Sequence, residues 1–173
     1  MSDARAANLL GALVVALHDE LASATTEAAA HGAAYPAALA TMLGEPGLTI
    51  EQLRQMLGLS HSGTVRLLDA LEEEGSVERR AGKDARSVAL QLTPQGRRRA
   101  RAVLDARRHA LEPALAVLTA AERAQLVRLS EKLLGSLTRD RVHSDHICRL
   151  CDLAVCPDAT CPVNCAVQDE GQT

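Results

Sequence analysis

Five cysteines near the C-terminus are the residues whose type and spacing most directly suggest chemistry. They fall within HICRLCDLAVCPDATCPVNCA, residues 146–166, and none of the 147 residues before Cys148 is a cysteine. Thiolates bind soft metal ions and react with oxidants. In a cytoplasmic protein, where structural disulfides are rare, clustered cysteines more often do one of these two things. The cluster therefore predicts a metal centre or a redox-sensitive group of thiols.

The first four cysteines have the spacing of a closed metal loop. Cys148, Cys151, Cys156 and Cys161 are separated by two, four and four residues, as in a zinc knuckle with cysteine in place of its histidine. Four thiolates can close tetrahedrally around a zinc ion, and four cysteines equally hold an iron–sulfur cluster. The spacing does not decide between zinc and iron–sulfur. Cys165 remains as a spare ligand or a reactive thiol.

Other interpretations of this segment stay open. His143 and His146 could substitute as metal ligands, or the thiols near Arg149 could sense oxidants without any metal. The segment could also be a zinc-folded docking module for a partner protein. We expect a short polar loop with almost no core of its own, so that bound metal would supply most of its folding free energy.

The charge pattern indicates what such a centre would act on. The 173 residues carry a net charge of −3, yet ten of the 19 Lys and Arg residues lie between positions 79 and 108. A local basic field inside an acidic protein is typical of a surface that faces nucleic acid. The chain has no Phe or Trp and a single Tyr35, which argues against a protein that stacks single-stranded bases.

A helix-turn-helix is predicted directly before this basic stretch. Thr49 and Gln52 form a capping box that opens a short helix, and Gly58 can supply the turn that ends it. Ser60 caps a further helix with an apolar stripe, and Gly75 ends it. Two helices joined by so tight a turn read as a helix-turn-helix.

A β-hairpin follows, and long helices flank the whole unit. Val77–Arg79 and Val88–Leu92 alternate as short strands around a polar loop that contains glycine. Helical periodicity covers residues 5–30 and 35–44 before the unit, and it resumes after Thr93-Pro94. The predicted fold class is therefore mostly α with a small β-hairpin wing.

Three stretches together carry a family resemblance. LTIEQLRQMLGLSHSGTVRLLDALEEEGSVER, the KDAR loop and LTPQG occur in the order and spacing of the MarR family of bacterial transcription regulators. The chain resembles that family over roughly residues 8–138. The resemblance implies a homodimeric winged-helix repressor that binds double-stranded DNA, with helices 5–30 and 98–138 forming the dimer interface. The cysteine segment is not part of the general family pattern.

Helix-turn-helix docking places the start of the second helix at the base edges of DNA. Short hydroxyls there suit contacts with phosphates or bases, and an arginine one turn further can reach a guanine edge. The candidate contacts on this helix are Ser60, His61, Ser62, Gly63, Thr64 and Arg66.

The loop between the strands supplies a second set of candidates. Asp84 and Arg86 look like the family's DNA-contacting pair, in which the carboxylate holds a guanidinium that enters the minor groove. Arg79, Lys83 and Arg97 are expected to contact phosphates or to be solvated charges.

Two further expectations concern compartment and catalysis. The stretch LLGALVVAL is apolar, but no run approaches the length that spans a bilayer, and charged residues on both sides argue against a signal peptide. We therefore expect a cytoplasmic protein with no membrane partner. His143-Ser144-Asp145-His146 contains the residue types of a catalytic triad, but adjacent residues do not converge in space. The chain is not expected to be an enzyme.

The predicted organisation has four parts. They are an N-terminal dimerisation helix (1–34), a winged helix-turn-helix domain (35–97), C-terminal dimerisation helices (98–140) and a cysteine-rich tail (141–173).

The predicted function is a dimeric transcriptional regulator, acting as a repressor, whose DNA affinity responds to the metal or redox state of the tail. The alternative is a response to a small aromatic effector, which the family often binds between its dimer helices and its DNA-binding lobe. His18, His31 and Tyr35 are the sparse polar residues available for such a pocket.

Overall fold

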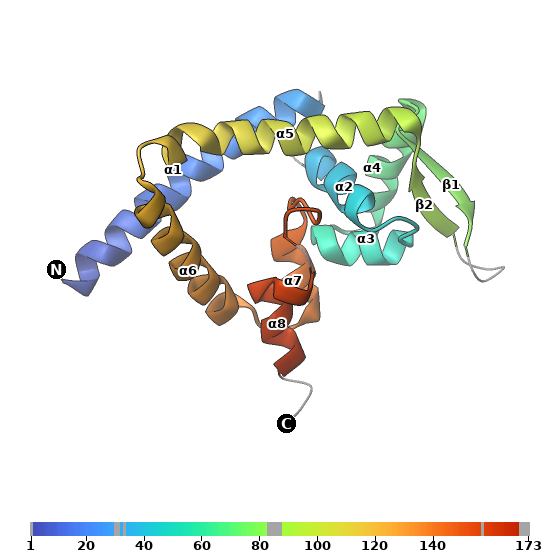
Figure 1. Ribbon diagram of the computed structural model, residues 1–173. Helices are drawn as coiled ribbons and strands as arrows, with labels where there is room; N and C mark the ends of the chain where they lie inside the picture. Colours follow the sequence, from blue (N-terminus) through green and yellow to red (C-terminus); the bar gives the residue numbers. More distant parts are fainter. Residues whose placement is uncertain (1, 30–31, 33, 83–87, 157, 170–173) are drawn as a thin grey trace.

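The computed structural model describes residues 2–29, 32, 34–82, 88–156 and 158–169. Most of them are helical, and one two-stranded antiparallel sheet is present, which confirms the predicted fold class. In Figure 1 the long helix α5 forms a spine, with α1 beside it and the winged-helix lobe at one end. The chain returns from the other end through α6, and α7 and α8 lie between α6 and that lobe.

The elements follow the predicted order. In chain order they are α1 (Asp3–Ala29), α2 (Ala34–Gly44), α3 (Ile50–Leu57), α4 (His61–Glu73), β1 (Val77–Ala81), β2 (Val88–Leu92), α5 (Pro94–Ala116), α6 (Ala120–Leu137), α7 (Arg141–Cys148), the 3-10 turn η1 (Asp158–Thr160) and α8 (Pro162–Asp169).

Local signals account for the two helices of the helix-turn-helix. The capping box at the start of α3 is present: the Thr49 amide donates to Gln52 Oε1 at 2.9 Å, and the Gln52 amide donates to Thr49 Oγ1 at 3.2 Å. Gly58 ends α3 in the left-handed conformation with φ 65°, which glycine adopts without steric cost. The core of the lobe is apolar, and its fully buried leucines are Leu39, Leu53, Leu68, Leu71 and Leu90.

The hairpin is joined to the helices along one edge. Its register pairs Val77 with Leu92 and Ala81 with Val88. On the other side of β2, the Leu90 amide donates to the Leu48 carbonyl at 2.8 Å, and the Gly47 amide donates to the Leu90 carbonyl at 3.2 Å. The segment before α3 therefore covers an edge of the sheet and fixes the hairpin to the lobe.

The start of α5 lies unusually close to the lobe. Thr93 caps this helix by accepting from the Gly96 amide at 3.0 Å, and Pro94 occupies its first position. A Cβ atom at Gly96 would lie 1.9 Å from the Ser76 carbonyl oxygen. Only glycine permits this approach, through which the spine helix is anchored to the lobe.

The outer helices leave apolar side chains uncovered. None of the residues of α6 is buried in the single chain, and in α1 only Thr25 and Ala29 are. The exposed apolar residues on these helices include Leu9, Leu10, Leu13, Val14, Leu126, Leu129, Leu133 and Leu137. By length and composition alone, α1 could cross a membrane, contrary to the expectation that no run reaches that length. In the structure α1 packs along α5.

The tail differs from the predicted loop. It contains two helices and a 3-10 turn, and it buries Ser144, Cys161, Val163 and Asn164. Asp140 caps α7 by accepting from the His143 amide at 2.8 Å. Because α8 packs on α6 and α7 packs on α3, the tail draws its core from helices outside it, and α3 is distant in sequence. The sequence of the tail alone could not show this packing.

Candidate functional site

The first turn of α4 carries most of the predicted DNA-contacting residues. Ser60 caps the helix by accepting from the Gly63 amide at 3.1 Å, and its hydroxyl lies 3.3 Å from that of Ser62. Ser60, His61 and Ser62 are exposed, and Gly63 is half-buried. This turn therefore presents hydroxyls, an imidazole and helix N-terminal amides to solvent, which suits contact with an anion or a base edge.

The two residues further along α4 point in different directions. Thr64 is fully buried, and its hydroxyl donates to the Ser60 carbonyl at 3.0 Å, so this candidate belongs to the core and not to the exposed face. The helical stripe that includes Leu67, Leu68 and Leu71 turns Thr64 inward as well. Arg66 is exposed and makes no hydrogen bond or ion pair with any other described residue. Its guanidinium is available to a ligand.

Arg79 is occupied within the protein. Its guanidinium pairs with Asp69 at 2.8 Å and with Glu72 at 2.6 Å, and both carboxylates belong to α4. The pairs fasten β1 to the second helix of the helix-turn-helix, so the arginine has a structural role that the sequence analysis missed. The acidic residues of α4 could have indicated these ion pairs. Arg79, however, lies on β1, ten residues after Asp69 and seven after Glu72.

The wing candidates Lys83, Asp84 and Arg86 lie outside the described residues. The strands that carry this loop are described as far as Ala81 and from Val88 onward, and they form the predicted antiparallel pair. The assignment of the three residues to DNA contact therefore remains a prediction.

The arginine-rich start of α5 also makes internal contacts. Arg97 donates to the Leu92 carbonyl at 2.6 Å. Arg99 pairs with Glu74 and donates to Ser76 Oγ at 3.0 Å.

Glu74 also binds Tyr35, so this carboxylate joins the start of α2 to the spine helix. The Tyr35 hydroxyl donates to Glu74 Oε1 at 3.4 Å. Burial, together with the negative charge of Glu74, raises the pKa of Tyr35 to about 12. Tyr35 is thus a core residue, whereas His18 is exposed and His31 lies outside the described residues.

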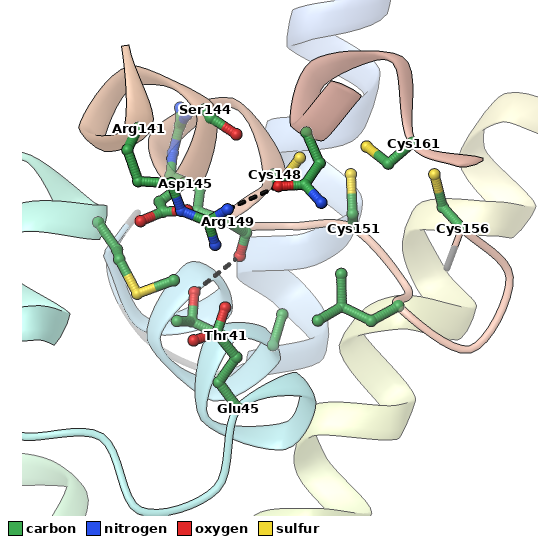
Figure 2. A pocket seen from close by; sticks show the side chains of 14 residues that line it. Thr41, Glu45, Arg141, Ser144, Asp145, Cys148, Arg149, Cys151, Cys156 and Cys161 are labelled. Carbon is green, nitrogen blue, oxygen red and sulfur yellow. Dashed lines mark hydrogen bonds and ion pairs between the residues drawn. The ribbon is translucent and has the colours of Figure 1, made fainter. Parts of the chain in front are cut away.

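Four cysteines line one pocket between the tail and the lobe. Figure 2 shows Cys148, Cys151, Cys156 and Cys161 gathered on one side of it, while Thr41 of α2 and Glu45, directly after that helix, line another side. The enclosed cavity has a volume of about 40 Å³. Cys161 is buried and the other three thiols are half-buried, so the cluster is sheltered from solvent but not sealed.

Two of these thiols interact directly. The Cys148 thiol donates a hydrogen bond to the sulfur of Cys151 and raises its own pKa by doing so. The same hydrogen bond, with the positive charges of Arg107 and Arg149, lowers the pKa of Cys151 to about 6. The arrangement favours a thiolate at Cys151 and a protonated thiol at Cys148, which is the state of a reactive dithiol pair.

A metal ion would require these thiols to move closer together. Among the described residues, no three His, Cys, Asp or Glu side chains converge enough to hold an ion as placed. The cavity has room for an ion or for one or two water molecules. Four sulfur donors around so small a space fit a single soft ion better than a multi-iron cluster.

The remaining tail candidates lie elsewhere. Cys165 does not line the pocket, and its thiol is 3.8 Å from the Ala159 carbonyl. His146 donates through Nδ1 to the Met56 carbonyl at 2.9 Å, and His143 accepts from Arg139 at 3.3 Å. Neither histidine is among the residues that line the cysteine pocket, so neither is placed as a substitute ligand.

Comparison with known proteins finds relatives of the winged-helix part of the chain. Residues 33–87 match the model of the MarR family. The transcriptional repressor MprA of Escherichia coli is 33% identical over 113 residues, which cover 64% of this chain and 63% of MprA. The match thus spans less than two thirds of this curated relative.

Solved structures extend the likeness to the flanking helices. The Mycobacterium tuberculosis MarR family protein Rv2887 in complex with DNA is 25% identical with a TM-score of 0.61, over 73% of this chain and 95% of that one. Its complex with salicylic acid is 28% identical with a TM-score of 0.57, over 72% and 93%.

Apo MarR from E. coli gives 25% identity and a TM-score of 0.60, over 72% of this chain and 96% of that one. Of these relatives, MprA is a transcriptional repressor, in line with the expectation from the sequence that the chain is not an enzyme. The cysteine segment lies beyond the residues that the family model matches. The winged-helix lobe and its flanking helices are therefore similar to proteins of the MarR family.

Proposed function

We propose that the protein is a cytoplasmic, dimeric repressor that binds double-stranded DNA and whose affinity responds to the state of its cysteine centre. The observation that carries DNA binding is the exposed first turn of α4 on a lobe of MarR fold. This turn presents Ser60, His61 and Ser62, and Arg66 follows with no partner among the described residues. A relative with the same fold has been solved in complex with DNA. The first turn would enter the major groove, and Arg66 would reach a guanine edge or a phosphate.

The wing would add contacts in the minor groove. Arg86, held by Asp84, would enter the groove where A·T tracts narrow it, and Lys83 would contact phosphate. A dimer would present two such lobes to a pseudo-palindrome with half-sites about one helical turn apart. The test is fluorescence anisotropy with duplexes that vary this spacing. Equal affinity for every spacing and sequence would contradict sequence-specific binding by a dimer.

A second copy of the chain is the expected cover for α1 and α6. An 18-residue helix with no buried residue and a stripe of Leu126, Leu129, Leu133 and Leu137 exposes apolar area that water would disfavour. In Figure 1, α6 and the N-terminal part of α1 lie toward the end of α5 that is away from the DNA-binding lobe. Such a dimer would set the distance between the two α4 helices, and so it would set the match to the operator.

The cysteine centre is proposed to respond either to a metal or to oxidants. In the metal form Cys148, Cys151, Cys156 and Cys161 would hold a zinc ion or, with a larger rearrangement, an iron–sulfur cluster. A bound ion would cross-link α7, the loop after it and the start of α8. Cys165, outside the pocket, would be an exchangeable ligand or a reactive thiol.

The oxidant response needs only two of these thiols and a peroxide. The Cys151 thiolate would attack one oxygen of hydrogen peroxide to give a sulfenic acid, and the hydroxide released would take up a proton to form water. The Cys148 sulfur would then attack the sulfenic sulfur and lose its proton, so that a second water leaves and a disulfide forms. The interaction between the two thiols, which shifts the pKa of both, favours this step.

One experiment separates these forms. Metal analysis and absorbance of anaerobically purified protein distinguish zinc, an iron–sulfur cluster and bare thiols. A variant with Ser at 148, 151, 156 and 161 is then compared with the parent for operator affinity, with and without chelator or peroxide. If the cysteine centre is a sensor, chelator or peroxide changes the operator affinity of the parent and leaves that of the variant unchanged. A metal-free parent that binds DNA like the variant in every condition would exclude it.

An aromatic effector is the second candidate. A relative is solved with salicylic acid, and a cavity of about 510 Å³ lies between α2, α5 and the loop 151–154 of this chain. That volume is in the range of small-ligand pockets. Under this alternative the tail would be a zinc-folded docking module. Salicylate would then weaken operator binding equally in the parent and in the cysteine-free variant, whereas sensing by the cysteine centre predicts no such shared response.

A further inference from the structure

Several contacts dock the tail on the DNA-binding lobe, and three of them lie close to the cysteines. His146 Nδ1 donates to the Met56 carbonyl of α3 at 2.9 Å. Thr41 Oγ1 of α2 donates to the Arg149 carbonyl at 3.1 Å. Leu153 packs over Gly44, where an added Cβ would lie 2.7 Å from the leucine Cδ1. The residues of the first two pairs are 90 and 108 positions apart in sequence, so tertiary structure alone brings them together.

Among these contacts, the one made by His146 lies at the turn between α3 and α4. Its imidazole lies at the C-terminal end of α3, where the last carbonyls of a helix have no partner within the helix. By donating to the Met56 carbonyl, it satisfies one of them. A Cβ at Gly58 would lie 3.4 Å from His146 Cε1, so the ring also covers the glycine that ends α3. The chain turns there from α3 into α4, and the direction of α4 depends on that turn.

The docking contacts alternate with the cysteines along the chain. His146 is two residues before Cys148, Arg149 lies between Cys148 and Cys151, and Leu153 lies between Cys151 and Cys156. On its other side the tail packs on α6 through α8. Figure 1 shows α7 and α8 in the space between α6 and α3. The cysteine pocket therefore sits between a helix of the expected dimer interface and the helix-turn-helix.

We infer that His146 is a positioning residue, which holds the α3–α4 turn of the helix-turn-helix in place and through which the cysteine centre acts on DNA affinity. The second half of this inference rests on the proposed function. When the cysteine centre closes or opens, the end of α7 shifts, and the His146 imidazole moves relative to the Met56 carbonyl. This movement tilts α4 relative to the DNA groove that it would enter. The route differs from an effect through the dimer helices alone, because it acts within one subunit.

The test uses the full-length protein with three variants. His146→Ala removes the contact, and His146→Asn keeps a donor close to the position of Nδ1. His143→Ala is the matched control, because His143 lies in the same helix, and among the described residues its side chain is hydrogen-bonded to Arg139, just before that helix, and not to the lobe. Three quantities are measured in each: thiol and metal content, operator affinity by anisotropy, and hydrogen–deuterium exchange of the backbone amides of residues 56–60.

The expected result is local and specific. His146→Ala keeps the parent's thiol and metal content, exchanges faster at residues 56–60, and changes operator affinity by about fivefold or more. In this variant the operator affinity is the same in both states of the cysteine centre. His146→Asn restores parent behaviour, and His143→Ala never departs from it. Recovery with asparagine would not be expected if the histidine merely filled space.

The remaining outcomes separate this inference from the proposed sensing. If His146→Ala matches the parent in both operator affinity and exchange, the inference is overturned, whether or not the parent senses metal or oxidant. If the parent ignores chelator and peroxide while His146→Ala still alters affinity and exchange as expected, the docking role stands and the sensing fails.

Discussion

Single arginines in this lobe divide into those that fasten the structure and those left for a ligand. Arg79 is held by Asp69 and Glu72, and Arg99 by Glu74, so their charges are largely neutralised inside the protein. Arg66 has no such partner among the described residues. A guanidinium free of internal ion pairs can bind phosphate or guanine without first breaking a contact.

The first prediction follows from this difference. Arg66→Ala should weaken operator binding by about tenfold, within the range of one arginine contact to a base or phosphate. Arg108→Ala removes the same charge from the middle of α5, where it pairs with Asp105 and Glu112, and should leave binding near the parent value. Anisotropy across a salt series checks both. Equal losses in the two variants would show a general charge effect instead of a contact by Arg66.

The second prediction concerns the wing. Arg86→Ala should weaken binding most at sites with A·T-rich flanks, because the narrow minor groove there has the most negative potential. The far-ultraviolet circular dichroism and the unfolding midpoint should stay those of the parent. The same affinity as the parent over the whole salt series would remove this residue from the interface.

The third prediction uses the dithiol pair in metal-free protein. Because the pKa of Cys151 is lowered to about 6, its alkylation by iodoacetamide should approach its full rate near neutral pH, where an ordinary thiol with pKa about 8.5 is still mostly protonated. Cys148→Ala removes the hydrogen bond that contributes most to this shift, so it should move the rate profile of Cys151 to higher pH. Peptide-resolved mass spectrometry measures the rates. If the pH dependence of Cys151 alkylation is the same in Cys148→Ala as in the parent, Cys148 does not lower the pKa of Cys151.

At the scale of the elements, the junction between the lobe and the spine is the tightest contact. The start of α5 lies against the Ser76 carbonyl, and the Thr93 hydroxyl donates to the Gly75 carbonyl at 2.6 Å. Since α5 also packs along α1, this junction connects the outer helices to the lobe. Its stability should therefore depend on the absence of a side chain at Gly96.

Gly96→Ala should lower the free energy of unfolding by about 3 kcal/mol, because a Cβ there would overlap the Ser76 carbonyl and force the helix away. Gly11→Ala is the matched control. It lies in α1 with nothing within 4 Å of the added Cβ, so it should be neutral or stabilise by up to about 1 kcal/mol. Urea denaturation measures both. A Gly96 variant as stable as Gly11→Ala would contradict the close approach.

For the whole molecule, the decisive feature is the apolar surface that a single chain leaves open on α1 and α6. Leu133→Asp should convert the dimer to a monomer in sedimentation velocity and weaken operator binding at the same time, since burying a carboxylate in an apolar interface is costly. Lys132→Asp introduces the same residue one position away from the stripe and should remain dimeric. A monomeric Leu133 variant that keeps parent affinity would separate dimerisation from DNA binding.

What the sequence determined by itself was set by neighbours close in the chain. Thr49 with Gln52 is a capping box that the structure contains, and Gly58 takes the left-handed conformation that its place predicts. Caps and turns depend on hydrogen bonds within a few residues, so they can be read from local sequence. The hairpin strands and the order of the elements were predicted for the same reason.

What only the tertiary structure decided involves partners far apart in the chain. It turned Thr64 into the core, paired Arg79 with two carboxylates of α4, and folded the expected loop of the tail into α7 and α8. It also placed His146 against the C-terminal end of α3, where its partner Met56 lies 90 positions earlier in the chain. Periodicity shows which face of a helix is apolar, but not which distant surface will cover that face. The cysteine spacing could therefore predict a centre, while the position of that centre beside the helix-turn-helix depended on the packing of the whole chain.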